Sequence, residues 1–267
     1  MHPIFLDLGF IQIHWYGVMA AIAAIAAYEL MCANRKYAEI SKDQAASLIF
    51  YCVLLGGVIG ARIFYVMLNW EIYAKRGWLS VFRIDQGGLV FYGGFFLAAA
   101  LVVLYARRHK LSMIAVLDVM APALAIGHAI ARIGCFLQGC CYGAATECAL
   151  GVHFPLESGI GGGEAVHPVQ LYESAANLAL GIVLFVLVRK ARRGVALSAY
   201  IVGYGILRFL LEFLRGDAER GVWGTFSTSQ IVCLVLIPLG VLLLLFFALG
   251  KDAFASLERK AEANGKR

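Results

Sequence analysis

Two arginines lie inside long apolar stretches of the sequence, where a charged side chain is costly and usually functional. Arg132 lies in HAIARIGCFLQGCCYG, and Arg208 lies in YGILRFLLEFLRGD. A guanidinium group binds phosphate oxygens in a bidentate manner and stays charged even where water is scarce. The two arginines therefore predict an anion site, and the anion that best fits these apolar surroundings is a lipid phosphate.

A polar stripe runs along the segment that contains Arg208. Its members fall within about 80° of one another, at 100° per residue of helix. They are Tyr204, Arg208, Glu212 and Arg215. The stripe fits a phosphate site. Arg208 and Glu212 are also four residues apart, which fits an internal ion pair that only packs helices together.

His128 and Cys135 share a helix face with Arg132, because they lie four residues before it and three residues after it. A lone histidine on such a face is more often a packing residue than a functional one. Beside Arg132, His128 is also a candidate for proton transfer, since imidazole gains and loses its proton near neutral pH.

A group of cysteines follows Arg132. Its members are Cys135, Cys140, Cys141 and Cys148. The CxxxxCC spacing is not a standard structural zinc pattern, even with His128 and His153 as further ligands, so no metal site is predicted. A disulfide among the last three cysteines is favoured instead, because their loop is expected on the oxidising side of a membrane.

Tyr92 lies in the glycine-rich segment DQGGLVFYGG. Together with Asp85 and Gln86, the glycines indicate a loop that dips toward a site. The alternative is that they are small residues at a close contact between two helices, which is common in membrane proteins.

Composition and hydropathy place these residues in membrane-spanning helices. The chain has 267 residues, of which 61% are hydrophobic and 15% charged, whereas a soluble domain carries about 25% charged residues. Apolar runs of about 20 residues recur, each long enough to cross a bilayer core of roughly 30 Å. The sequence thus predicts an all-α, polytopic membrane protein with a single transmembrane domain over residues 1–267. The seven predicted spans are 13–32, 45–68, 89–106, 114–136, 168–188, 195–214 and 227–249.

Basic residues are distributed unevenly over the predicted connections. Fifteen of the 23 Lys and Arg residues lie in the tail and in the connections after the first, third and fifth spans, and five lie in the opposite connections. The positive-inside rule then places the N-terminus outside, the tail 251–267 in the cytoplasm, and the loops 69–88 and 137–167 outside. Segment 1–12 is apolar but too short to span, so we expect it at the outer interface. The net charge of +6 follows from this topology and does not indicate a nucleic-acid partner.

Six motifs together resemble those of one family of membrane enzymes, the prolipoprotein diacylglyceryl transferases. They are HWYG, LLGGVIGARIFYV, GGLVFYGG, ARIGCFLQGCCYG, HPVQLYE and GYGILRFLLEFLR, in the family's order and spacing over about residues 12–235. The resemblance implies transfer of a diacylglyceryl group from phosphatidylglycerol to the lipobox cysteine thiol of prolipoproteins, with release of glycerol phosphate. It also implies a multi-pass protein of the bacterial cytoplasmic (inner) membrane. The implied partners are phosphatidylglycerol, prolipoprotein signal peptides and membrane lipids.

The resemblance also implies roles for individual residues. Arg132 matches the arginine that opens the family signature and Arg208 matches a second essential arginine, and both are expected to stabilise the charge of the leaving phosphate. Tyr16 and Tyr92 are expected to orient donors or relay a proton. Further expected substrate-binding residues are Glu212, Tyr204, Gln138, Gly143 and His14. Gln170, Tyr172 and Glu173 fit the motifs without an assigned role.

The chain departs from the family pattern at residues tied to the thiol acceptor. The family's HGG histidine is Tyr92 here, Cys135 and Gln138 stand for two asparagines, and Cys140 stands for a glutamate. These departures leave open a non-catalytic or altered-acceptor relative that binds lipid. A lipid transporter is a further alternative, but such proteins commonly contain inverted repeats and none is visible. Nothing in the sequence indicates a metal or nucleotide cofactor.

Overall fold

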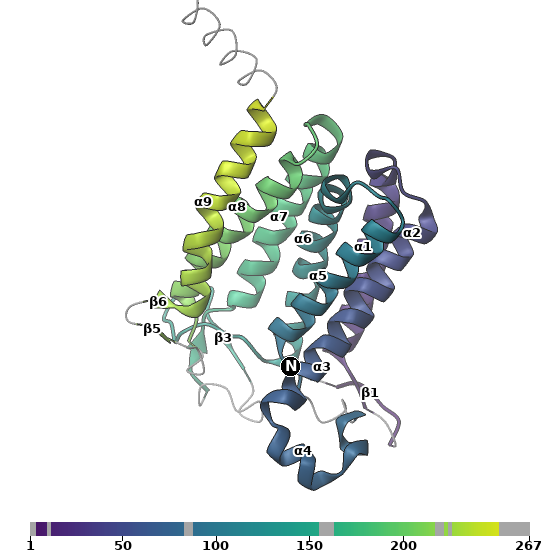
Figure 1. Ribbon diagram of the computed structural model, residues 1–267. Coiled ribbons are helices and arrows are strands. Elements are labelled where there is room, and N and C mark those ends of the chain that lie inside the picture. Colours follow the sequence, from purple (N-terminus) through teal and green to yellow (C-terminus); the bar gives the residue numbers. More distant parts are fainter. Residues whose placement is uncertain are drawn as a thin grey trace, which may run out of the picture. The chain divides into compact units, whose positions relative to one another are not determined.

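The computed structural model describes residues 4–9, 12–82, 88–154, 163–216, 222–223 and 226–250, and it is mostly helical (Figure 1). Seven helical stretches in these ranges are long and apolar enough to cross a membrane. They are Trp15–Ala38, Lys42–Leu68, Phe91–Arg108, Met113–Gln138, Val169–Lys190, Val195–Leu214 and Thr228–Leu249. Each predicted span matches one of these stretches, which confirms the seven-helix prediction.

Contacts within the chain group it into two compact units. The first unit comprises Met1–Leu30 and Leu117–Arg267, and the second comprises Met31–Val116. Part of the predicted loop 69–88, part of the predicted loop 137–167 and the whole tail 251–267 lie outside the described residues. Which side of the membrane each loop faces stays a prediction.

The second unit contains a long helical span with a local change of helix type. Helix α2 (Lys42–Ala46) starts at a capping box, in which Ser41 and Gln44 satisfy each other's backbone N–H groups. It continues as the π-helix η1 (Ser47–Leu55) and then as α3 (Gly56–Leu68). Two shorter helices follow, α4 (Trp70–Arg76) and η2 (Trp78–Phe82).

Helix α5 (Phe91–Arg108) packs closely on α3 through glycines. A Cβ atom added to Gly60 would collide with the backbone of Gly93, and one added to Gly94 would collide with that of Gly57. These glycines therefore serve a close helix contact, as the packing interpretation of the GGLVFYGG segment expected. Asp85 and Gln86 of that segment lie outside the described residues.

Arg62, a third arginine within the spans, binds backbone carbonyl groups of the second unit. Its guanidinium donates to Val81 O at 2.7 Å and to Ser80 O and Gly88 O at 3.1 Å each. The side chain is only 8% exposed. Because its charge is used to hold the connection between α3 and α5, Arg62 has a structural role.

The first unit contains the start of α1 (Trp15–Ala38), most of α6 (Met113–Gln138), and the helices α7 (Val169–Lys190), α8 (Val195–Leu211) and α9 (Thr228–Leu249). Figure 1 shows α7, α8 and α9 side by side. Ala121, Ala125 and Leu184 form a buried cluster between α6 and α7. Asp118 on α6 accepts hydrogen bonds from the backbone N–H groups of Gly194 and Leu197, where α8 begins. A carboxylate at a helix N-terminus is stabilising, so this contact fixes α8 relative to α6.

The fold is mostly helical, as predicted, and three short antiparallel strand pairs accompany the helices among the residues that the structure describes. β1 (Ile4–Asp7), in the segment that was expected at the interface, pairs with β2 (Gln12–His14). β3 (Val152–His153) pairs with β4 (Ala165–Val166), and β5 (Val222–Trp223) pairs with β6 (Phe226–Ser227). Each pair lies outside the helices, where strand pairing satisfies backbone hydrogen bonds that no helix provides.

Candidate active site

Arg132 on α6 forms a buried ion pair with Glu173 on α7. Arg132 Nε lies 2.9 Å from Glu173 Oε2, and Arg132 Nη2 donates to Glu173 Oε1 at 3.1 Å. The two side chains are 15% and 3% exposed. A two-point contact of this kind fixes the plane of the guanidinium as well as its position.

His128 joins this pair, as its position four residues before Arg132 predicted. Its Nε2 atom lies 3.0 Å from Glu173 Oε1 and 3.1 Å from Arg132 Nε. A protonated Nε2 donates to the carboxylate, and an unprotonated Nε2 accepts from the guanidinium. The protonation of His128 therefore decides which partner it binds, which is a property that suits a proton-transfer group.

Arg208 on α8 forms the predicted ion pair with Glu212, with Nη2 at 2.8 Å from Oε2. The same Nη2 atom donates to Ser229 Oγ on α9 at 3.2 Å. Arg208 Nη1 is buried and has no hydrogen-bond partner among the described residues. A buried donor without a partner is unfavourable, so this N–H group is suited to receive an oxygen of a bound anion.

The two arginines act on the same neighbouring groups. Both guanidinium charges lie within electrostatic range of the Glu173 carboxylate and of the Tyr204 hydroxyl. The ring of Tyr204 on α8 lies 5.5 Å from the ring of His128 on α6, measured between centroids. The first unit thus gathers Arg132, Arg208, His128 and Tyr204 around Glu173.

Tyr16 lies at the start of α1, where this helix packs against α6. A Cβ atom added to Gly134 would lie 3.0 Å from Met19 Cβ and 3.4 Å from Tyr16 Cα, so the two helices are in close contact here. The Tyr16 hydroxyl is within electrostatic range of Arg132 and Cys135. The structure therefore places Tyr16 near Arg132.

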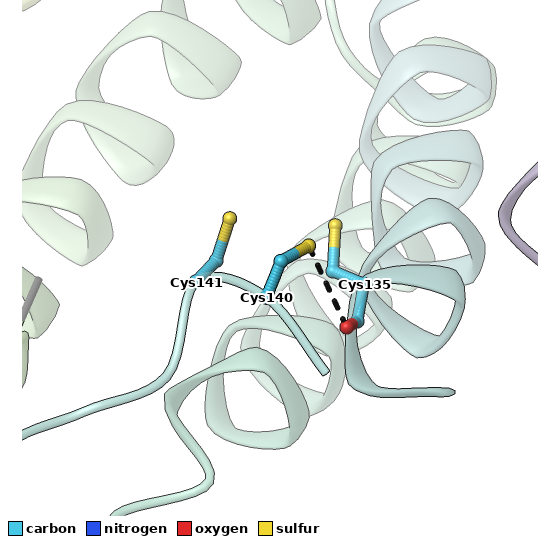
Figure 2. A group of neighbouring side chains, drawn as sticks. All are labelled: Cys135, Cys140 and Cys141. Carbon is cyan, nitrogen blue, oxygen red and sulfur yellow. Dashed lines mark hydrogen bonds between the residues drawn. The ribbon is translucent and has the colours of Figure 1, made fainter. Parts of the chain in front are cut away.

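Three cysteines gather at the end of α6 and in the loop after it. Figure 2 shows the side chains of Cys135, Cys140 and Cys141, whose Sγ atoms lie within 4.8 Å of one another. Arg132 Nη1 lies 3.9 Å from Cys135 Sγ. Hydrogen bonding to Cys135 and Cys140 lowers the pKa of Cys141, and the charges of Arg132 and Arg215 act in the same direction.

The expected disulfide among Cys140, Cys141 and Cys148 is not formed. All seven cysteines are free thiols, and Cys148 is exposed, whereas Cys140 is hydrogen-bonded through its thiol to the carbonyl oxygen of Cys135. Adjacent cysteines such as Cys140 and Cys141 rarely reach the geometry of a disulfide without distortion. The spacing of the cysteines did not indicate that the loop folds back and brings Cys140 and Cys141 close to Cys135.

Gly143 lies where the loop after α6 pairs with the end of the α8 segment. Its N–H group donates to His167 O at 2.8 Å, and it forms a β-bridge with Arg215. A Cβ atom added here would lie 2.6 Å from both His167 Cβ and Leu214 O. The predicted binding residue thus has a packing reason to be glycine.

Gln138 and His14, which were both predicted to bind substrate, lie in different surroundings. Gln138 ends α6, and its Oε1 atom is buried without a hydrogen-bond partner in the part of the chain that the structure describes. His14 is an exposed residue at the end of β2. Gln170 was not assigned a role, yet its Nε2 atom donates to Cys140 O at 2.7 Å and holds the cysteine loop.

The predicted polar stripe on α8 holds for three of its four members. Tyr204, Arg208 and Glu212 follow one another at helical spacing, but α8 ends at Leu211 and a 3-10 turn follows over Glu212–Leu214. Arg215 is extended, with φ of −78° and ψ of 140°, and so leaves the stripe. The prediction was wrong for Arg215 because it assumed an unbroken helix.

Tyr92 belongs to the second unit, at the start of α5. It is 47% exposed, and its ring lies 5.8 Å from that of Phe91.

The sequence assigned no role to Glu173, which is the shared partner of Arg132 and His128. An acidic residue in the first turns of an apolar 22-residue helix was the signal that could have identified it.

The chain is similar to a known family along almost its whole length. A family model described as prolipoprotein diacylglyceryl transferase matches residues 3–246. A phosphatidylglycerol–prolipoprotein diacylglyceryl transferase of Geobacter sulfurreducens is 34% identical over 248 residues, which cover 90% of this chain and 92% of that protein. Proteins of the same name from Clostridium tetani and Pseudoalteromonas translucida are 32% and 35% identical, over 90% and 91% of this chain and 96% and 92% of their own lengths.

Proposed function

The chain belongs to the prolipoprotein diacylglyceryl transferase family, and we propose that it transfers a diacylglyceryl group from phosphatidylglycerol to the lipobox cysteine thiol of prolipoproteins. The products are a thioether-linked lipid on the cysteine and glycerol phosphate. The proposed location is the cytoplasmic membrane of a bacterium, where the donor lipid and the signal peptides of the acceptors meet. The observation that carries the proposal is the convergence of Arg132 and Arg208 on Glu173 and Tyr204.

The reaction is a displacement at a glycerol carbon of the donor lipid. The acceptor sulfur forms a bond to this carbon as the bond between the carbon and the phosphate oxygen breaks. The electron pair of the broken bond stays on that oxygen, so negative charge grows on the leaving glycerol phosphate. Positive groups fixed beside the phosphate in surroundings of low dielectric constant lower the barrier of such a step.

Arg208 is suited to bind the phosphate directly. Its Nη2 atom is held by Glu212 and Ser229, which leaves the buried Nη1 group to donate to a phosphate oxygen. Because the guanidinium is held on one side only, it can bind the anion without losing its orientation. Tyr204, one helical turn earlier, is within reach of the same region.

Arg132 is positioned by Glu173 so that its charge stays at a fixed place. The two-point contact with Glu173 leaves Nη1 directed toward Cys135. The carboxylate neutralises part of the positive charge before substrate binds, which makes the burial of two arginines in an apolar protein less costly. The leaving phosphate then interacts with both arginines as its charge develops.

His128 is the candidate for removing a proton in the described part of the site. The thiolate, and not the thiol, is the attacking species. His128 contacts both Glu173 and Arg132 through one nitrogen, so a gain of a proton at Nε2 strengthens its bond to Glu173. Tyr16 and Tyr92 are proposed to orient the donor lipid or to relay the proton.

The test is a transfer assay with the purified full-length protein in detergent. The substrates are phosphatidylglycerol with a labelled acyl chain and a peptide that contains a lipobox cysteine. We expect labelled thioether peptide and one equivalent of glycerol phosphate, none with a peptide whose cysteine is serine, and a loss of about a hundredfold or more with Arg132→Ala. Lipid binding without product would identify a non-catalytic relative, and lipid movement across vesicles without product would identify a transporter.

A further inference from the structure

Three thiols from two parts of the chain meet beside the arginine of the candidate site. Cys135 belongs to the last turns of α6, and Cys140 and Cys141 belong to the loop that follows. Their Sγ atoms lie within 4.8 Å of one another, and Figure 2 shows the three side chains projecting into the same region. At the family positions of two of them, Cys135 and Cys140, the resemblance expects asparagine and glutamate.

The backbone of the loop is shaped to bring the thiols together. Gly139 and Cys141 both adopt positive φ angles, of 75° and 62°. Residues other than glycine rarely adopt this conformation, so Cys141 is held in it by its surroundings. The N–H group of Cys140 donates to Cys135 O at 3.1 Å, and Cys140 O accepts from Gln170 Nε2 at 2.7 Å. The loop is therefore fixed from both α6 and α7.

The spacing of the sulfur atoms fits a single small metal ion. With a metal–sulfur bond of about 2.3 Å, neighbouring sulfur atoms of a tetrahedral zinc site are about 3.8 Å apart. Sulfur atoms that already lie within 4.8 Å of one another need to move by about 1 Å at most to reach this arrangement. The group offers three sulfur ligands, and no fourth ligand belongs to it among the residues described. Catalytic zinc sites also have three protein ligands and one open position.

We propose that Cys135, Cys140 and Cys141 bind one Zn²⁺ ion and that the open fourth position receives the thiol of the acceptor cysteine. The inference rests on the proposed function, because it names the group that activates the acceptor. A thiol that binds a metal ion loses its proton, which is the activation that the transfer requires. In this chain the metal ion would favour loss of the acceptor proton, which His128 is proposed to take up.

The step balances without any redox change. Zinc binding displaces the protons of the three cysteine thiols. The acceptor thiol loses its proton on binding the open position. That proton passes to His128, the proposed proton acceptor, and then leaves with the glycerol phosphate or to water. The bound sulfur then forms its bond to the glycerol carbon while the bond from that carbon to the phosphate oxygen breaks. The thioether product carries no charge, so it binds zinc weakly and is released.

Charges around the cluster favour the metal-bound state. Zn²⁺ with three thiolates carries one net negative charge, and Arg132 Nη1 lies 3.9 Å from Cys135 Sγ. Arg215 is within electrostatic range of Cys141. Two nearby guanidinium groups therefore stabilise the thiolates that zinc requires.

The experiment measures bound metal in the protein purified from membranes in detergent with zinc supplied. We expect one zinc per chain in the unaltered protein and in Cys148→Ser, which removes an exposed cysteine of the same loop. Cys135→Ser, Cys140→Ser and Cys141→Ser should each retain less than about a tenth of the metal. In the Co²⁺-substituted protein, the sulfur-to-cobalt absorption band should gain intensity when a lipobox peptide is added, and not when its cysteine is serine.

The outcomes separate the metal site from the proposed function. Reduced protein that takes up no zinc or cobalt, or equal metal loss from Cys148→Ser, overturns the site. Undiminished lipid transfer by the metal-free protein overturns the proposed role of zinc in activating the acceptor thiol. The proposed function is then retained. One tightly bound zinc together with no lipid transfer under any condition retains the metal site and overturns both the proposed function and the activation of an acceptor.

Discussion

Glu173 holds Arg132 and His128 at the same time, with its Oε2 atom 2.9 Å from Arg132 Nε and its Oε1 atom 3.0 Å from His128 Nε2. The carboxylate is 3% exposed and belongs to α7, whereas both partners belong to α6. One residue therefore joins two helices and orients the two groups to which we assign phosphate binding and proton transfer.

The substitution Glu173→Gln is expected to lower lipid transfer by about tenfold to a hundredfold, because the amide cannot balance the charge of Arg132. Removing one partner of a buried ion pair destabilises a protein by about 3–5 kcal/mol when no other group compensates. We thus also expect a lower thermal midpoint in detergent. Glu147→Gln is the matched control, since Glu147 is exposed in the loop after α6. Normal transfer by Glu173→Gln would contradict the positioning role.

The substitution Arg208→Ala is expected to reduce transfer by about a hundredfold or more, because a lost charge-stabilising contact costs on the order of 3 kcal/mol in the transition state. Arg208→Lys should restore little activity, since the ammonium group of lysine cannot bind Glu212 and the phosphate at the same time as a guanidinium group does. Ser229→Ala removes only one hydrogen bond and should reduce the rate by less than about tenfold. Initial rates at matched amounts of membrane protein measure all three. Activity of Arg208→Ala near that of the unaltered protein would place the phosphate elsewhere.

The substitution Gly143→Ala is expected to destabilise the fold of the loop after α6. An added methyl group would lie 2.6 Å from Leu214 O and from His167 Cβ, and overpacking of this kind costs about 1–3 kcal/mol. The thermal midpoint should fall, and transfer should fall with it. Gly57→Ala is the control, because a Cβ atom there meets nothing within 4 Å on a helix that tolerates alanine. Equal thermal midpoints for the two variants would show that the loop can move to make room for the methyl group at little cost in stability.

Reporter fusions test the predicted topology. Fusions after Lys36, Arg108 and Arg193 should report a cytoplasmic location, and one at Gly162, beyond the described residues, should report an external one. The basis is the uneven distribution of basic residues between the two sets of connections. A cytoplasmic signal at Gly162 would contradict the predicted orientation.

Hydropathy and helical period predicted the features of this chain that depend on local sequence. The seven spans follow from runs of apolar residues, and the contacts of Arg132 with His128 and Cys135 follow from spacings of four and three residues. The contact with Glu173 crosses 41 positions, so no local period encodes it. The hydrophobic effect selects which residues are buried, and the way two helices pack decides which buried polar groups meet.

Two predictions failed because the chain leaves regular structure near the site. Arg215 was placed by continuing a helix that ends four residues earlier. The disulfide predicted among Cys140, Cys141 and Cys148 is not formed. Turns at Gly139 and Cys141, both with positive φ, instead bring the loop back to Cys135 at the end of α6. Such turns depend on contacts with other elements, here with Gln170 and His167, and those contacts are not visible in the residue pattern of the loop.

Tyr92 stands where the resemblance to the family expects a histidine, which affects how the acceptor loses its proton. Phenols lose their protons only near pH 10, so tyrosine is a poor general base near neutral pH. We expect Tyr92 to act as a hydrogen-bond donor or an orienting group. Tyr92→Phe should then lower the transfer rate only moderately, by less than about tenfold, and Tyr92→His should be tolerated.

His128→Ala should reduce transfer more than Tyr92→Phe does, because it removes a group that contacts both Arg132 and Glu173. Initial rates of lipid transfer to a lipobox peptide, at matched membrane expression, compare the three variants. His128→Gln separates two roles of the histidine, since an amide can keep a hydrogen bond to Glu173 but cannot accept a proton. If Tyr92→Phe is inactive while His128→Ala is normal, the phenol of Tyr92 is the essential proton-transfer group, and the role assigned to His128 is wrong.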